Sequence, residues 1–93
     1  QIEGGIIMGI SLAMNEKLTI KSGSIAETNY DEYKIAQMKH TPEIDIEIVE
    51  SDLPPSGVGE PPVAPVIPAI TNAIFSATGS RIRKLPIGKQ RLI

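Results

Sequence analysis

Residues 54–62 read Pro-Pro-Ser-Gly-Val-Gly-Glu-Pro-Pro, and this run limits what the chain can fold into more than any other stretch. Proline fixes φ and lacks a backbone donor, so it interrupts helices and strand ladders. Glycine has no Cβ, so the backbone can turn sharply there or come close to a ligand. The run is therefore predicted to be a loop, and such a loop can hold the carboxylate of Glu60 rigidly.

An amphipathic helix is predicted from residue 2 to about residue 15, because apolar residues recur there at three- and four-residue steps. They are Ile2, Ile6, Ile7, Ile10 and Met14. Gly5, Gly9 and Ala13 form a second stripe, of small residues. Because each glycine inside a helix costs up to ~1 kcal/mol relative to alanine, this helix needs a tightly packed neighbour. That requirement favours a larger protein around the chain.

A second helix is predicted from about residue 66 to residue 78. Proline is tolerated in the first turn of a helix, so Pro65 and Pro68 place the start near Pro65. Gly79 suits the position just after the last turn, where a left-handed conformation is common. The many isoleucines and alanines between residues 67 and 77 predict that most of this helix is buried.

Strands are predicted on both sides of Ser22-Gly23, over residues 17–21 and 24–28, as a hairpin. Residues 44–50 alternate isoleucines with acids and predict a half-buried strand. Residues 82–87 are either a closing strand or an extended tail. The expected fold class is α+β, with two helices packed on one face of a small, largely antiparallel sheet.

Composition indicates a fragment of something larger. The chain has 93 residues and an apolar content of 41%, yet only three aromatic residues, which is few for a self-sufficient core. It contains no cysteine, which excludes disulfides and thiolate metal sites and leaves the redox compartment unreadable. No apolar run approaches the roughly 20 residues of a membrane span.

The charges are unevenly distributed. All 11 acidic residues lie within residues 1–60, whereas five of the nine basic residues lie beyond residue 80, so the two parts are expected to attract each other. The basic tail has no interleaved aromatic residues, so we interpret it as a solvated or subunit-facing tail rather than a nucleic-acid site. Glu43, Asp45 and Glu47 fit the solvent face of a strand better than a cation site, and His40 fits an exposed position without a metal.

Three segments resemble one known family. They are residues 42–50, the Gly57-Val58-Gly59-Glu60-Pro61-Pro62 run and residues 65–80. Together they resemble the C-terminal end of the molybdenum hydroxylase large subunit, in the family of xanthine dehydrogenase and aldehyde oxidase. The likeness is greatest to the isoquinoline 1-oxidoreductase beta-subunit type and extends over roughly residues 1 to 87. The opening Gln1-Ile2-Glu3-Gly4-Gly5 is similar to the family's Q-x-E-G-G segment.

This resemblance implies a function for the parent protein. Residues 1–93 would be the C-terminal segment of a molybdopterin-binding domain. Glu60, in the family's G-V-G-E segment, would be the general base that takes a proton from a molybdenum-bound hydroxyl. Gln1 and the backbone of Gly57, Val58 and Gly59 would contact the cofactor, with no protein ligand to the metal.

The implied reaction is hydroxylation of an N-heteroaromatic or aldehyde carbon, with water as the oxygen source. The implied partners are the remainder of the large subunit and a small iron–sulfur subunit, since no cysteine here could hold such clusters. A bacterial cytoplasmic or periplasmic location stays open. The isolated fragment is expected to be inactive, because several segments of the large subunit grip the cofactor in this family.

Two other functions are compatible with the sequence. Residues 62–65 and 65–68 both satisfy P-x-x-P, the pattern of ligands for SH3-type domains. The apolar Val66, Ile67 and Ile70 fit a buried helix better than such a ligand. The chain could also be a purely structural fragment without chemistry of its own.

Overall fold

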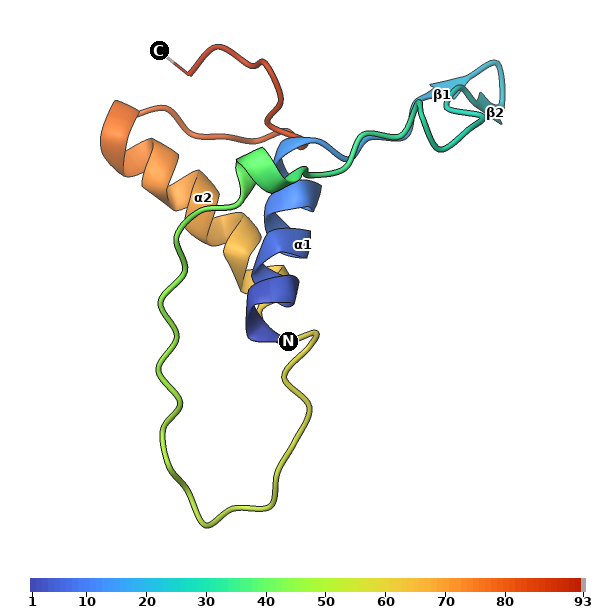
Figure 1. Cartoon of the computed structure of the whole chain (residues 1–93). Helices are drawn as coiled ribbons and strands as arrows, with labels where there is room; N and C mark the ends of the chain where they lie inside the picture. Colours follow the sequence, from blue (N-terminus) through green and yellow to red (C-terminus); the bar gives the residue numbers. More distant parts are fainter. Residues whose placement is uncertain (93) are drawn as a thin grey trace.

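The computed structural model describes residues 1–92 and confirms an α+β fold with two helices and one antiparallel hairpin. The elements are α1 (Ile2–Met14), β1 (Ile20–Lys21), β2 (Ser24–Ile25), the 3-10 helix η1 (Met38–His40) and α2 (Val63–Thr78). The two long helices lie side by side, whereas the hairpin stands off at one end and a long loop extends from the other (Figure 1). The helices pack on each other and not on the sheet, which corrects the expected layering.

The small residues of α1 explain this packing. Gly5, Gly9 and Ala13 are buried. Their four-residue spacing places them on one face of the helix. A Cβ on Gly9 would lie 2.5 Å from the carbonyl oxygen of Val63 and 2.9 Å from Cβ of Val66. The glycine stripe therefore lets the backbone of α2 approach α1 closely. The tightly packed neighbour that the stripe predicts is present within the chain itself.

The second helix begins three residues before the predicted start. Residues 61 and 62 form a turn that leads directly into the helix, and the amide of Val63 donates to the carbonyl of Glu60 at 2.9 Å. Pro65 then falls in the first turn, where no donor is needed, while Pro68 lies inside the helix. At the other end Gly79 adopts a left-handed conformation, with φ of 74°, as predicted.

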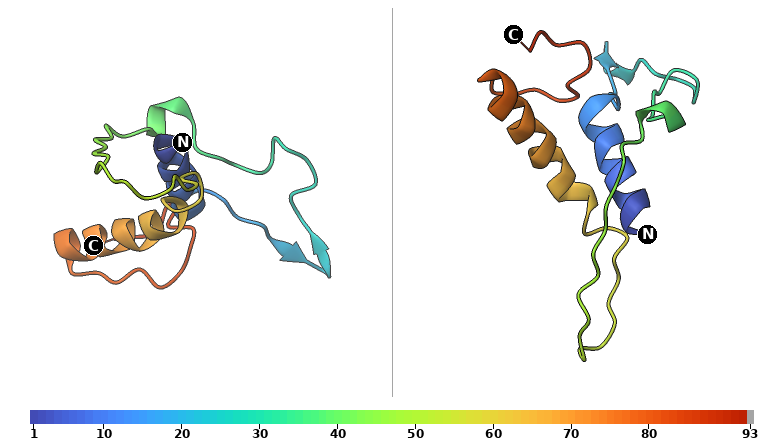
Figure 2. Two further views of the ribbon diagram at one scale, coloured as in Figure 1. Left: turned by 90° about the horizontal axis from the view of Figure 1, so that it is seen from below. Right: turned by 60° about the vertical axis from the view of Figure 1, so that its left-hand side comes forward.

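The prediction that most of α2 is buried is wrong. None of its residues is fully buried among the described residues, because only one side of α2 packs against α1. In Figure 2 the opposite side of α2 has no neighbouring helix or strand.

The hairpin is shorter than predicted but lies at the predicted place. Ile20 pairs with Ile25 and Lys21 with Ser24. Ser22 and Gly23 both have positive φ, of 51° and 80°, which is the geometry of a tight two-residue hairpin turn. The pairing ends after two residues on each strand, and both isoleucines remain exposed.

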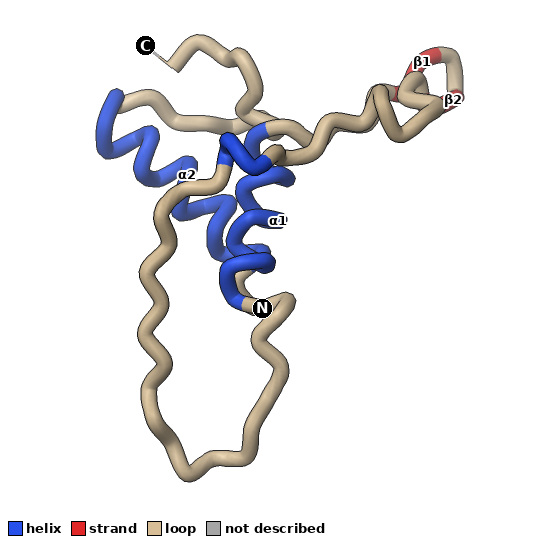
Figure 3. Tube along the Cα trace, in the orientation of Figure 1, coloured by secondary structure: helices blue, strands red, loops and turns tan. Residues whose placement is uncertain are grey.

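The strand predicted at residues 44–50 is not formed. These residues lie in the long loop between η1 and α2, drawn as coil in Figure 3. Their alternating pattern is real, but a strand also needs a neighbour whose backbone can pair with it. The described part of the chain supplies no such neighbour, and residues 82–87 form no strand either, with bends at residues 84–86.

The core sits at the C-terminal end of α1. Ala13 and Ile87 are the fully buried apolar residues there, at 0% and 1% exposure. The amides of Ile87 and Gly88 donate to the last carbonyls of α1, those of Ala13 and Met14, at 2.7 and 3.0 Å. The C-terminal tail thus caps α1, while the opposite end of the helix faces the loop that carries Glu60.

The acidic residues of the long loop do not contact the basic residues of the C-terminal tail, so the predicted attraction between the two parts is wrong for this loop (Figure 1). The loop of residues 42–60 and the C-terminal tail lie at opposite ends of the molecule (Figure 1). The helix pair separates them, so their charges do not meet. No helix within residues 1–92 is long and apolar enough to cross a bilayer.

Candidate functional site

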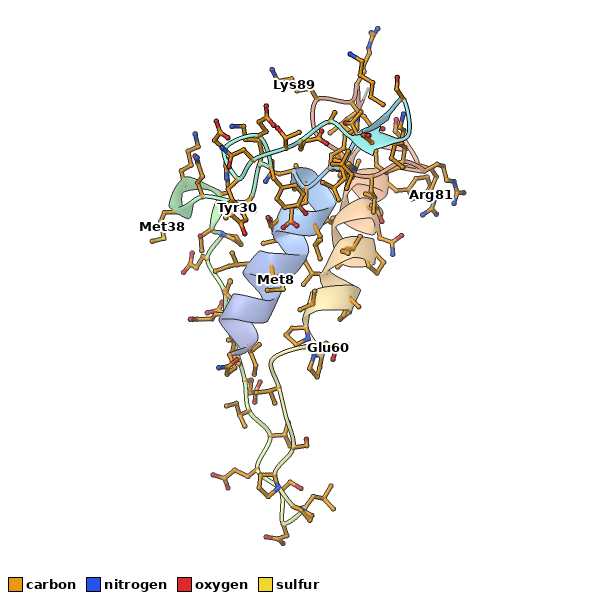
Figure 4. The ribbon with its side chains drawn as sticks, turned by 90° about the vertical axis from the view of Figure 1, so that its right-hand side faces the viewer. Met8, Tyr30, Met38, Glu60, Arg81 and Lys89 are labelled. Carbon is orange, nitrogen blue, oxygen red and sulfur yellow. The ribbon has the colours of Figure 1, made fainter. Side chains whose placement is uncertain are left out.

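The glycine-rich loop brings Glu60 to the first turn before α2. Its carbonyl accepts from the amide of Val63, which fixes its main chain at the helix start. Its side chain is exposed at the end of the helix pair that faces the long loop (Figure 4). Within residues 1–92 the carboxylate forms no hydrogen bond or ion pair. Both oxygens are therefore available to a ligand or a second polypeptide.

Gln1 lies beside this loop although the two are far apart in sequence. A Cβ built on Gly59 would be 3.2 Å from Oε1 of Gln1. Gln1 is the N-cap of α1, yet its side chain does not cap the helix. Within residues 1–92 its amide group thus has no hydrogen-bond partner and can bind another group. The structure brings together two of the residues that the sequence singled out, Gln1 and Gly59.

Gly5 allows the glycine-rich loop to pack closely on α1. We did not identify it as a site residue from the sequence. A Cβ at this position would lie 2.6 Å from the carbonyl oxygen of Gly59 and would also collide with the ring of Pro62. The absence of a side chain at Gly5 therefore determines how closely the loop before Glu60 approaches the first turn of α1. The signal was present in the sequence as the small-residue stripe.

Gly57 and Val58 lie farther out on the loop. A Cβ on Gly57 would meet nothing within 4 Å, so its backbone is open to an approaching group. Val58 is 45% exposed and lines a shallow depression with residues of the first turn of α1 and of the facing arm of the loop. The lining residues are Gln1, Ile2, Glu3, Ile46, Ile48 and Val58. The depression lies next to Gly59, so the sequence-predicted residues gather at one end of the molecule.

This end of the chain fits one side of a polar cofactor such as molybdopterin, although it could not enclose one. It offers the free amide of Gln1, the open backbone at Gly57 and the free carboxylate of Glu60, which are groups that bind a pterin by hydrogen bonds. No group of three or more histidine, cysteine, aspartate or glutamate side chains that could hold a metal ion gathers within residues 1–92. The remaining contacts would have to come from other polypeptide.

The titratable groups with shifted pKa values lie elsewhere, around the hairpin. The amide of Thr19 donates to Glu27 at 2.7 Å and lowers the pKa of that carboxyl group. The amide of Thr28 lowers the pKa of Glu32 in the same way. The hydroxyl of Tyr33 donates to Glu16 at 2.5 Å, which raises the pKa of Tyr33. These contacts stabilise the local fold and do not touch the loop of Glu60.

His40 is exposed, as predicted, and has a structural role. Its Nδ1 accepts from the amide of Gln37 at 2.9 Å and completes a reciprocal cap of η1. The two P-x-x-P segments, residues 62–65 and 65–68, lie at the start of α2. From Val63 onward they belong to α2, an α-helix, which is not the extended conformation that SH3-type domains bind.

Comparisons with known proteins show what the chain as a whole is similar to. The family described as molybdopterin cofactor-binding domain matches residues 1–42. Isoquinoline 1-oxidoreductase subunit beta of Brevundimonas diminuta is 37% identical over 94% of this chain. A membrane-bound aldehyde dehydrogenase of Gluconacetobacter polyoxogenes, whose name specifies pyrroloquinoline quinone, is 40% identical over 94% of the chain. A putative xanthine dehydrogenase molybdenum-binding subunit of Escherichia coli is 39% identical over 99% of it.

The chain spans only a small part of each relative. It covers 11% of the first two relatives and 13% of the third. The similarity therefore bears on a short segment that these longer proteins share, and it extends over both α1 and the loop that carries Glu60.

Proposed function

This chain belongs to the xanthine dehydrogenase and aldehyde oxidase family of molybdenum-binding subunits, and from that membership we propose that it supplies part of a molybdenum hydroxylase active site. In this proposal residues 1–93 are the C-terminal segment of the molybdopterin-binding domain. The observation that carries the proposal is the convergence of Gln1, Gly59 and the free carboxylate of Glu60 at one end of the helix pair.

The proposed reaction converts a C–H bond of an N-heteroaromatic ring or an aldehyde into C–OH. Water supplies the oxygen, and two electrons and two protons are released for each turnover. The bound molybdenum cofactor would supply the two-electron redox chemistry and would acidify the water-derived oxygen. A separate iron–sulfur subunit would carry the electrons away, since this chain has no cysteine to hold a cluster.

Glu60 would act as the general base. Its carboxylate would take the proton of the water-derived hydroxyl group before that oxygen attacks the substrate carbon. The turn that leads into α2 fixes the main chain of Glu60, and Gly5 sets how close the loop lies to α1. Other polypeptide covering this exposed side chain would exclude bulk water from the carboxylate.

Gln1 and the glycine-rich backbone would orient the cofactor. The Gln1 amide can donate and accept hydrogen bonds at once, which suits the edge of a pterin ring. The backbone of Gly57, Val58 and Gly59 would pass close to the cofactor where no side chain obstructs it. Because one relative is named for pyrroloquinoline quinone, metal analysis of the intact protein is part of the test.

The decisive experiment is Glu60→Gln in the intact enzyme. The change keeps the size of the side chain and removes its ability to accept a proton. We expect unchanged assembly and molybdenum content, with hydroxylation slowed by ~10²–10⁴-fold, the usual contribution of a general base. Molybdenum is measured by elemental analysis and the rate by single-turnover kinetics at saturating substrate.

Glu50→Gln is the matched control, because Glu50 is an exposed carboxylate on the same loop and lies outside the glycine turn. It should behave like the wild type. If Glu60→Gln kept most of the single-turnover rate, Glu60 could not be the base. If it lost molybdenum as well as activity, its role would be in cofactor binding instead.

A further inference from the structure

Residues 44–50 are an extended segment whose backbone has no partner. Within residues 1–92 none of their amides or carbonyls takes part in a hydrogen bond. The segment contains no proline, so all seven residues carry a donor and an acceptor. Such a row of unpaired groups is a template for pairing with another strand.

The apolar and acidic side chains of this segment lie on opposite faces. Ile46 and Ile48 line the depression that Val58 and the first turn of α1 also line. Asp45 and Glu47 alternate with them and so lie on the opposite face, where both are exposed. The segment therefore has the amphipathic pattern of a half-buried strand without the neighbour that would complete it.

Within residues 1–92 the carboxylates of this face also form no ion pair. The basic residues beyond residue 80 belong to the C-terminal end of the molecule, where Arg81 and Lys89 lie far from the loop (Figure 4). Arg81 is engaged there with Asn72 and with the ring of Phe75. Opposite charges directly across a strand pair stabilise the pairing, whereas like charges destabilise it.

We propose that residues 44–50 form an edge strand that is completed by an extended polypeptide strand bearing lysine or arginine opposite Asp45 and Glu47. Backbone hydrogen bonds would supply the pairing, and the basic side chains would fix the register. Apolar side chains on the other face of the added strand would continue the surface made by Ile46 and Ile48. This pairing would hold the loop that leads to Glu60, but the inference does not depend on the catalytic role of Glu60.

Hydrogen–deuterium exchange on the intact protein that contains this chain tests the pairing. The alternate amides of residues 44–50 that point toward the added strand should exchange more slowly than the amides of residues 52–58 by roughly 100-fold, well within the range of local opening energies. Equal, fast exchange in the two stretches would overturn the proposal. Because the readout is not activity, the result stands whether or not Glu60 is the base.

Glu47→Lys tests the charge of the partner, with Asp52→Lys as the matched control. Both replace an exposed carboxylate of the same loop, but only Glu47 lies on the acidic face of the segment. Glu47→Lys should reduce the protection of residues 44–50, and Asp52→Lys should not. Amides of α1, followed in the same experiment, show whether each variant is folded. If the amides of residues 44–50 were equally protected in a folded Glu47→Lys protein, the proposal that the added strand is basic would be wrong.

Zero-length carbodiimide cross-linking then identifies the strand. Asp45 or Glu47 should couple to a lysine in an extended segment outside residues 1–93. Coupling of these carboxylates only to lysines of this chain would contradict the proposal.

Discussion

Individual carboxylates of this chain fall into two groups according to their hydrogen-bond partners. Glu16, Glu27 and Glu32 each accept a hydrogen bond that closes a local turn or loop. Glu60 accepts none through its side chain, although its main chain is fixed by the turn before α2. A carboxylate with a fixed main chain and no side-chain partner within residues 1–92 can act on a group outside the chain, which is the role that we propose for Glu60.

Glu27 gives a pH-dependent test of the first group. The amide of Thr19 lowers the pKa of Glu27, so the ionised form is favoured in the folded chain. The stabilisation of the hairpin is therefore present above the ordinary glutamate pKa and is lost as the pH falls through the lowered pKa. The amide chemical shift of Thr19, followed by NMR, should titrate with a midpoint below the ordinary glutamate pKa.

In the Glu27→Gln variant the same amide should show no such titration, because the amide side chain has no proton to gain in this range. A midpoint at or above the ordinary glutamate value would mean that the Thr19 contact is absent in solution.

Among the elements, α1 organises the rest of the chain. It contacts the loop before α2 through Gly5 and α2 itself through Gly9. The hydroxyl of Ser11 accepts from the amide of Ala36, and the amides of Ile87 and Gly88 cap the end of α1. The face of small residues is the buried face of α1. The glycine-rich loop can lie close to α1 only because Gly5 has no side chain.

Gly5→Ala should therefore destabilise the chain and displace the loop before Glu60. The added methyl group would collide with Pro62 and lie 2.6 Å from the carbonyl of Gly59. Overpacking of this kind costs typically 1–3 kcal/mol, more than the ~1 kcal/mol that alanine gains in helix propensity. Denaturant unfolding measures the change.

Gly4→Ala is the control at the adjacent position. A Cβ there meets nothing within 4 Å, so only the gain in helix propensity remains and the variant should be slightly stabilised. If Gly5→Ala proved as stable as Gly4→Ala, the close packing of the loop on α1 would not exist in solution.

Sequence patterns within a few residues correctly predicted α1, the hairpin and the end of α2, because these features depend on interactions between residues close in sequence. Apolar steps of three and four gave α1, Ser22-Gly23 gave the hairpin and Gly79 gave the end of α2. The start of α2 was missed by three residues because the turn at residues 61–62 leads straight into the helix. The strand at 44–50 was wrong because a period-two pattern reports two faces but cannot supply a pairing partner.

The candidate site was only partly predictable for the same reason. The glycine and proline residues around Glu60 predicted a rigid loop, and the small-residue stripe predicted a close neighbour for α1. Neither signal says that the neighbour is the loop itself. The contact between Gln1 and Gly59 joins residues that are far apart in sequence, and it follows only once the two helices are packed.

Taken as a whole, the molecule is open. Its accessible surface is 7730 Å², whereas a compact protein of 10.0 kDa exposes about 5,200 Å². Its radius of gyration is 16.1 Å, against about 12 Å for a compact domain of this length. Apolar side chains such as Ile48, Val49 and Leu53 are more than three-quarters exposed. Surfaces of this kind are normally covered by other polypeptide.

The isolated 93-residue chain should therefore bind no stoichiometric molybdenum cofactor and should turn over no substrate. In the proposed arrangement it supplies only one side of the cofactor site, and no group of three or more metal-binding side chains gathers within its described residues, so a bound cofactor would remain exposed to water. Elemental analysis of the purified chain, mixed with released cofactor and passed through a desalting column, measures retention. The intact enzyme is the positive control, and a retained equivalent of molybdenum would contradict this expectation, because it would mean that these residues alone complete the site.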